Sequence, residues 1–122
     1  MRIFKNTWFS RYAGKEGITD VELKEAVNQL EAGQADADLG GGVYKLRVAR
    51  HGEGKAGGYR VIVFFKNNER TIYVYGFVKS AMGNINDKQL RDFKRTAKVV
   101  LALTDTQLGD LLKKGEYLEI RG

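Results

Sequence analysis

The chain has 122 residues, 43% of them apolar, and contains neither proline nor cysteine. This composition is typical of one globular domain, and we expect a single domain over residues 1–122 rather than a disordered or membrane protein. The absence of cysteine excludes disulfides, and with only one histidine, His51, the usual zinc sites are excluded as well. No apolar run approaches the ~20 residues that cross a bilayer, and no secretory signal begins the chain. We therefore expect a cytoplasmic protein with no membrane partner.

Positive charge is concentrated in the middle of the chain. Lysine and arginine number 21 against 15 aspartates and glutamates, a net charge of +6. The segment Val43–Lys79 has eight cations and two anions, whereas the remainder balances 13 cations against 13 anions. The eight cations are Lys45, Arg47, Arg50, Lys55, Arg60, Lys66, Arg70 and Lys79. Such a cluster is typical of a surface that docks on nucleic acid, although solvated outward positions of a sheet would give the same count.

Two helices are predicted in the first third of the chain. The first spans Asn6–Ala13, and its aromatic stripe is expected to lie in the core; the stripe is Trp8, Phe9 and Tyr12. The second spans 19–32, because Thr19 and Glu22 form a capping-box pattern before apolar residues at helical spacing. Gly33 then stops the helix, and residues 34–42 are predicted to be a connecting loop.

Three strands are predicted next, over 43–50, 59–66 and 70–79. The first alternates, so that its cations Lys45 and Arg47 share one face while its apolar residues share the other. The second is apolar on both faces and is expected at the centre of the sheet. A hairpin through 67–69 is expected to join the second and third strands.

The C-terminal part is predicted to be helical. Asp87 is the expected N-cap of a long amphipathic helix with a basic outer surface. Thr104 or Asp105 would cap a short helix that Gly115 ends, and residues 117–120 alternate too weakly to predict a strand. The expected fold is therefore α+β, in which N-terminal helices pack on a small, twisted antiparallel sheet that C-terminal helices follow.

A glycine-rich segment, VYKLRVARHGEGKAGGYR at 43–60, is the expected site of chemistry. Glycines let a backbone approach phosphate closely, and successive N–H groups in such turns bind anions. The segment lacks the GxxxxGK[ST] spacing of a P-loop, which disfavours nucleoside triphosphate binding.

The segment GGGVYKLRVARHGEGKAGGYRVIVFF, followed by IYVYGFVKSAMGNIN and a basic helix, resembles the RelE/HigB-like toxins of bacterial toxin–antitoxin modules. The resemblance is detailed over about 39–98. It implies a RelE-like fold and an mRNA interferase, a toxin that cuts mRNA in the ribosomal A site and thereby inhibits translation. It also implies an antitoxin partner, expected to be a helix-turn-helix protein, and no cofactor or metal.

In this chemistry the ribose 2′-OH attacks the adjacent phosphate, so the endoribonuclease must align the nucleotide, stabilise charge on phosphorus and move protons. The resemblance places the catalytic cations at Arg47, Lys55, Arg60 and Lys79. Contacts to mRNA or ribosomal RNA are expected at Lys45, Arg50, His51, Phe77 and Lys94. Many relatives carry a catalytic tyrosine near the C-terminus, but no motif surrounds Tyr117, so the general acid and base stay unassigned.

Each assignment has a structural alternative. Arg60 could pair with a carboxylate at the edge of a buried strand, and Phe77 could be a core residue rather than a base-stacking platform. Arg50 has the opposite strand parity to Arg47 and could be peripheral. A two- or four-residue hairpin loop would place Arg60 opposite Phe77, on the face of Lys79, whereas a three-residue loop would reverse that parity.

Two other functions fit the same charge. A non-catalytic RNA- or ribosome-binding module would bind with strong salt dependence and leave no cleavage products. A ParE-like gyrase poison would share the fold, but that type generally lacks the nuclease cations. Fold alone does not separate these functions.

Overall fold

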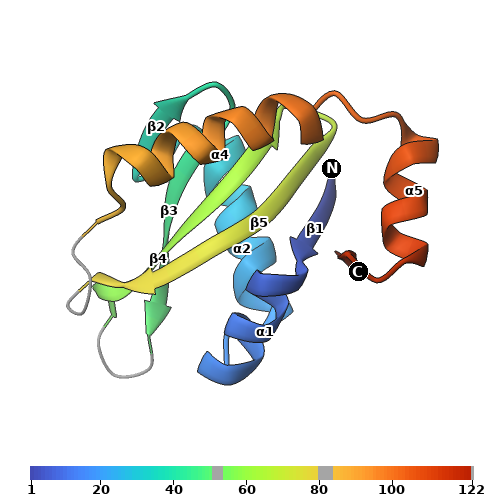
Figure 1. Ribbon diagram of the computed structural model, residues 1–122. Coiled ribbons are helices and arrows are strands. Elements are labelled where there is room, and N and C mark those ends of the chain that lie inside the picture. Colours follow the sequence, from blue (N-terminus) through green and yellow to red (C-terminus); the bar gives the residue numbers. More distant parts are fainter. Residues whose placement is uncertain (51–53, 80–83, 122) are drawn as a thin grey trace.

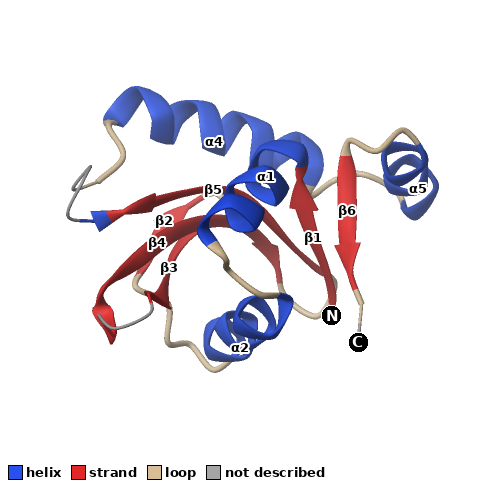
Figure 2. Cartoon of the chain, turned by 90° about the horizontal axis from the view of Figure 1, so that it is seen from below, coloured by secondary structure: helices blue, strands red, loops and turns tan. Residues whose placement is uncertain are grey.

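The computed structural model describes the backbone of residues 1–50, 54–79 and 84–121, and leaves the side chains of 54–57 outside that description. One sheet is sandwiched between helices: α4 lies across one face, and α1 and α2 cover the other (Figures 1 and 2). The described residues form four helices and six strands, and the sheet is mostly antiparallel. The predicted α+β class is confirmed. Within the described residues, no helix is both long and apolar enough to cross a membrane.

The helices begin where short polar side chains cap their first turn. They are α1 (Thr7–Glu16), α2 (Asp20–Glu31), α4 (Asp87–Val100) and α5 (Asp105–Lys113). Capping boxes at Thr19 and Thr104 confirm two predicted starts. The predicted cap at Asp87 was one residue too late, because Asn86 accepts the backbone N–H of Gln89 and Asp87 is the first helical residue.

The sheet has the order β2-β3-β4-β5-β1-β6. Its strands are β1 (Arg2–Asn6), β2 (Ala37–Gly40), β3 (Val43–Arg50), β4 (Gly54–Lys66), β5 (Arg70–Val78) and β6 (Tyr117–Ile120). The central position of β4 is confirmed, as it pairs with both β3 and β5. The sequence analysis missed β1, β2 and β6, which are only four or five residues long. β1 runs parallel to β5, so the sheet is not a simple meander.

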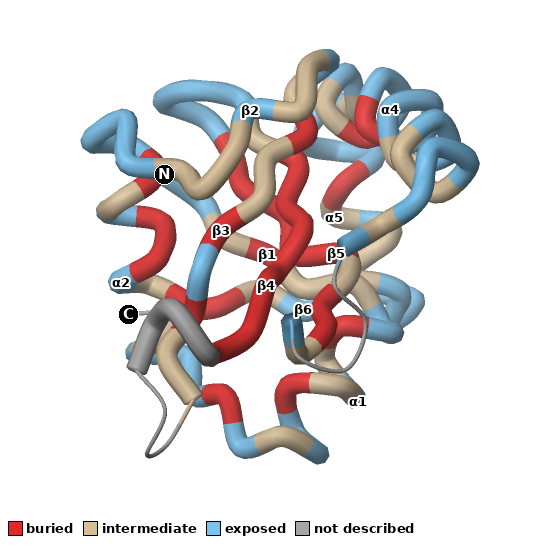
Figure 3. Tube along the Cα trace, turned by 90° about the vertical axis from the view of Figure 1, so that its left-hand side faces the viewer, coloured by how far each residue is buried: buried red, intermediate tan, exposed pale blue. Residues whose placement is uncertain are grey.

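Two apolar cores lie on opposite faces of this sheet. Under α1 and α2 are Phe9, Leu23, Val27, Leu46, Val61 and Tyr73, and under α4 and α5 are Phe4, Ile62, Phe64, Ala97, Val100 and Leu108. In Figure 3 the buried residues, drawn in red, run along β4 and the strands beside it in the middle of the sheet. The aromatic stripe of α1 divides: Phe9 is fully buried, but Trp8 is 44% exposed, so its predicted core position was wrong. Trp8 lies at the start of the helix and packs against Tyr12 and Tyr75 instead.

A β-bulge decides which residues of β5 face Arg60. Lys66 pairs with Arg70, so the hairpin loop has three residues, the length expected to reverse the parity. The register shifts between Ile62 and Val63, and this shift restores the pairing of Arg60 with Phe77. Val74 is the additional residue of β5 at the shift, and its carbonyl accepts a hydrogen bond from the Asn6 side chain (3.2 Å).

Candidate functional site: a cation cluster on the sheet

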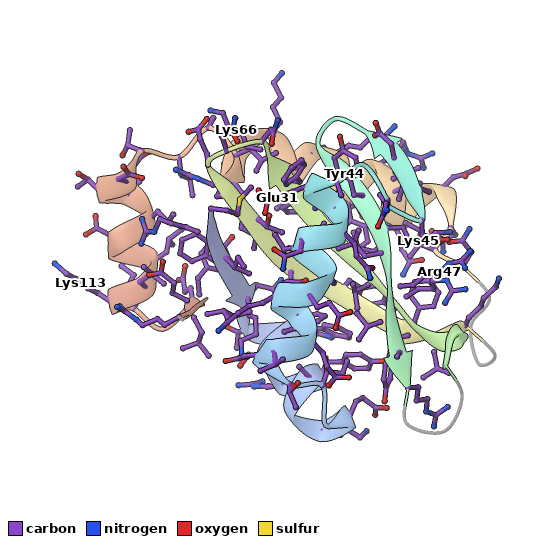
Figure 4. The ribbon with its side chains drawn as sticks, turned by 180° about the vertical axis from the view of Figure 1, so that it is seen from behind. Glu31, Tyr44, Lys45, Arg47, Lys66 and Lys113 are labelled. Atoms are coloured by element: carbon purple, nitrogen blue, oxygen red, sulfur yellow. The ribbon has the colours of Figure 1, made fainter. Side chains whose placement is uncertain are left out.

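Strands β3 and β4 place cations at one end of the sheet face that α4 covers. Along this face of β3, buried Val43 is followed by Lys45 and Arg47, as period-two alternation requires. Arg47 pairs directly with Arg60 of β4, so both side chains belong to this face. The predicted common face of Lys45 and Arg47 is confirmed; in Figure 4 both lie beside β3.

Asp36 neutralises part of this charge. It lies directly before β2, and its Oδ1 accepts a 2.7 Å hydrogen bond from Arg47 Nε. Its Oδ2 lies 3.5 Å from Lys45 Nζ and 3.6 Å from Arg60 Nε. One carboxylate therefore faces three cations with its two oxygens. We call Asp36, Lys45, Arg47 and Arg60 the cation cluster.

Burial differs sharply within the cation cluster. The side chain of Arg60 is 3% exposed, those of Asp36 and Lys45 are 11% and 16% exposed, and that of Arg47 is 47% exposed. Burial acts to raise the pKa of Asp36, but the hydrogen bond from Arg47 and the three positive charges outweigh it and lower that pKa below its ordinary value. Asp36 is therefore ionised at neutral pH. Ionised Asp36 is a carboxylate partner of Arg60, as the structural alternative for Arg60 expected. Of the two arginines, Arg47 is the one exposed to solvent.

A polar hollow adjoins the cation cluster. It has a volume of about 340 Å³, and its walls come from α2, β3 and the segment between α2 and β2. Asp36 and Arg47 line it together with Gln29 and Gln34, whose amides both donate and accept hydrogen bonds. This volume is in the range of small-molecule sites, so the hollow has room for a group attached to an anion held by Arg47.

The other candidate residues lie around the cation cluster or apart from it. Arg50 lies on the opposite face, with its guanidinium 6.0 Å from the ring centre of Tyr59, which agrees with a peripheral role. Phe77 is 5% exposed and offers no open ring face for a base, so its interpretation as a core residue is the correct one. Lys94 lies against the turn at Gly40 and Gly41.

Lys79 is exposed and directly follows the end of β5 at Val78, so the predicted third strand was one residue too long. His51 and the side chain of Lys55 lie outside the described residues.

The sequence analysis missed Asp36 because it assigned 34–42 to a loop. A signal was present in QADADLG at 34–40, where two carboxylates precede the cationic strand. That spacing could not distinguish them: Asp36 contacts the cations, whereas Asp38 turns back to accept the backbone N–H of Gly40 at 3.0 Å.

Comparison with known families agrees with the fold. A family model described as the RelE toxin of the RelE / RelB toxin-antitoxin system matches residues 1–120, almost the whole chain. The protein therefore belongs to the RelE toxin family. It is a toxin of a toxin–antitoxin system, and an antitoxin partner follows from that membership.

Proposed function

We propose that this RelE-family toxin is a ribosome-dependent mRNA endonuclease that acts in the cytoplasm as a single domain. The observation that carries the proposal is the convergence of Lys45, Arg47 and Arg60 on the two oxygens of one carboxylate. A phosphodiester also presents two charged oxygens, and arginine and lysine are the side chains that bind such groups in RNA.

Arg47 is the proposed first ligand of the scissile phosphate, because its planar guanidinium is nearly half exposed and already bonds a carboxylate. Lys45 would add positive charge beside it, and Arg60 would attract the same anion from the buried side of the cation cluster. Charge fixed in this way stabilises the additional negative charge that develops on phosphorus when the 2′-oxygen attacks.

Lys55 and Lys79 are proposed for charge stabilisation or proton transfer, on the strength of the resemblance. Arg50, His51 and Lys94 are proposed to contact mRNA or ribosomal RNA, where positive charge gives affinity without sequence selectivity. The antitoxin is proposed to be a helix-turn-helix protein.

The test is induced expression in bacteria with growth and mRNA 5′ ends followed together. We expect growth arrest with new in-frame cuts in translated messages, and loss of both in Arg47→Ala. The matched control is Arg11→Ala, which removes the same charge from exposed Arg11 on α1, a residue outside the cation cluster. Because Arg11 is on the other sheet face, its variant should cut like the wild-type protein.

Two outcomes would contradict the nuclease. Arrest without cuts would favour a gyrase poison or a toxin that blocks ribosomes, and DNA-break mapping would separate these. No arrest from a folded protein would favour an RNA-binding module without catalysis.

A further inference from the structure

The cation cluster already contains an anion. Asp36 is not an exposed surface partner: 11% of its side chain is accessible, and it meets cations from both β3 and β4. Its lowered pKa keeps it charged at neutral pH. An RNA phosphate that enters this cluster would meet a carboxylate in the position that its own oxygens require.

We propose that Lys45, Arg47 and Arg60 form a phosphate subsite that Asp36 guards: its carboxylate fills the subsite in the free protein and is exchanged for an RNA phosphate. This inference rests on the proposed function for the identity of the ligand. It assigns Asp36 a positioning role, because the carboxylate keeps three mutually repelling cations in place until the phosphate arrives.

Geometry supports an exchange rather than simple addition. Arg47 Nε and Arg60 Nε bind different oxygens of Asp36, as they would bind the two non-bridging oxygens of a phosphodiester. Arg60 is 3% exposed, so an entering anion has to displace a neighbour to reach it. Asp36 is suited to be that neighbour, since it lies outside the regular strands, at the residue before β2.

The charge balance makes the exchange measurable. With Asp36 in place the cation cluster carries three positive charges and one negative charge. Asp36→Asn keeps the size and the acceptor oxygen but removes the competing charge, so one more cation becomes available to RNA. Each phosphate neutralised in a single strand adds about 0.7 to the slope of log affinity against log salt.

The experiment measures binding of a fluorescein-labelled 2′-O-methyl RNA trinucleotide, which lacks the nucleophile and is not cut. We expect Asp36→Asn to bind at least about threefold more tightly than the wild-type protein at low salt, with a slope steeper by about 0.7. The matched control is Asp38→Asn, the same charge change two residues away at a carboxylate that hydrogen-bonds to Gly40. Its affinity should change by less than half as much. Equal affinities for the two variants, or weaker binding by folded Asp36→Asn, would overturn the proposal.

A second variant covers the case in which Asp36→Asn does not fold. Asp36→Asn combined with Arg60→Gln removes one charge of each sign, so the cation cluster keeps the net charge that it has in the wild-type protein. Loss of a cation alone would weaken binding, but loss of the competitor offsets it, and we expect the double variant to bind at least as tightly as the wild-type protein. Weaker binding would overturn the proposal.

Cleavage on ribosomes gives a readout that a merely structural ion pair would not move. Asp36→Asn should lower KM more than it changes kcat, because the carboxylate competes only before the phosphate is bound; an unchanged KM would count against the exchange. Failure of the two proposals is distinguishable. If the wild-type protein does not cut RNA but Asp36→Asn binds it more tightly, the nuclease proposal alone fails; if the wild-type protein cuts and Asp36→Asn does not bind more tightly, the guard alone fails.

Discussion

Arg47 and Arg60 are cross-strand partners with different energetic roles. Arg60 is 3% exposed and contacts Asp36 on the buried side of the cation cluster, whereas Arg47 is 47% exposed and contacts Asp36 on the solvent side. A buried charge that loses its partner is costly, but an exposed pair contributes little. The two residues should therefore be separable by stability even if both contact RNA.

We expect Arg60→Gln to lower the free energy of unfolding by about 3 kcal/mol, the lower end for a broken buried ion pair, because Asp36 keeps two other cations. Arg47→Gln should cost less than about 1 kcal/mol. Urea unfolding at pH 7 measures both. Equal losses in the two variants would show that the burial difference carries no energetic weight. Because Arg60→Gln weakens the fold, loss of activity in it cannot by itself assign a catalytic role.

Asn6 connects two elements that the sequence analysis treated separately. Its Oδ1 accepts the backbone N–H of Phe9 at 2.8 Å and caps α1, while its Nδ2 donates to the carbonyl of Val74 in β5. The β1–α1 junction is thereby tied to the β-bulge that sets the register of Arg60. This one side chain acts on both the helix start and the sheet face that holds the cation cluster.

We expect Asn6→Ala to lower the free energy of unfolding by about 2 kcal/mol, since it loses the helix cap and leaves a part-buried carbonyl without its donor. Asn6→Asp is the informative control, because a carboxylate still caps the helix but cannot donate to Val74. Chemical denaturation of both variants separates the two contributions. If Asn6→Asp were as stable as the wild-type protein, the bond to the bulge would be energetically silent.

The C-terminal tail is an integral part of the sheet sandwich. β6 pairs with the side of β1 that does not pair with β5. Leu108 of α5 is fully buried against the core under α4. Arg70, 5% exposed, donates to the carbonyl of Val100 at 3.3 Å and lies 3.5 Å from Asp105, so it connects β5 to the end of α4 and the start of α5. Cations near a helix C-terminus are favourable, which explains this buried arginine.

A chain that ends at Leu103 should therefore lose more stability than the roughly 3 kcal/mol that deletion of one large buried side chain costs. It should also self-associate, because the hydrogen-bonding edge of β1 is uncovered. Thermal unfolding and sedimentation velocity test both expectations, with a chain ending at Ile120 as the control. A monomeric, equally stable chain ending at Leu103 would contradict this role of the tail.

Stability should fall at both ends of the pH range. The folded-state pKa values of Asp36 and Glu119 are lowered, in Glu119 chiefly by the hydrogen bond from Arg2. The two carboxylates therefore contribute to stability above their unfolded pKa values, which are near 4. These contributions are lost as pH falls through the lower folded values. Burial raises the pKa of Tyr12 to about 12. Its contribution is present below pH 10, the ordinary value, and is lost as pH rises from 10 toward 12.

Tyr12→Phe isolates the contribution of Tyr12 to the loss of stability at alkaline pH. Because the variant has no hydroxyl to ionise, it should lose less stability between pH 8 and pH 11 than the wild-type protein. Urea unfolding at the two pH values gives the comparison, and all other titratable groups are common to both proteins. Equal losses would mean that the Tyr12 hydroxyl ionises as readily in the folded as in the unfolded protein.

Local signals in the sequence determined most of the helices and long strands. The capping boxes at Thr19 and Thr104 and the alternation of β3 depend on neighbours within a few residues, so they could be read directly. The short strands β1 and β6 could not, because they are held by hydrogen bonds to partners about 70 and 115 residues away along the chain. The β-bulge at Val74 likewise depends on the distant Asn6.

The same division holds for the site. The sequence by itself determined the excess of cations between Val43 and Lys79, the common face of Lys45 and Arg47, and the resemblance to the family to which the chain belongs. The tertiary structure decided that Arg60 is buried, that Phe77 belongs to the core and that Asp36 is the counterion. Charge and alternation are local properties of a chain, but burial and ion pairing arise only when β2, β3 and β4 come together.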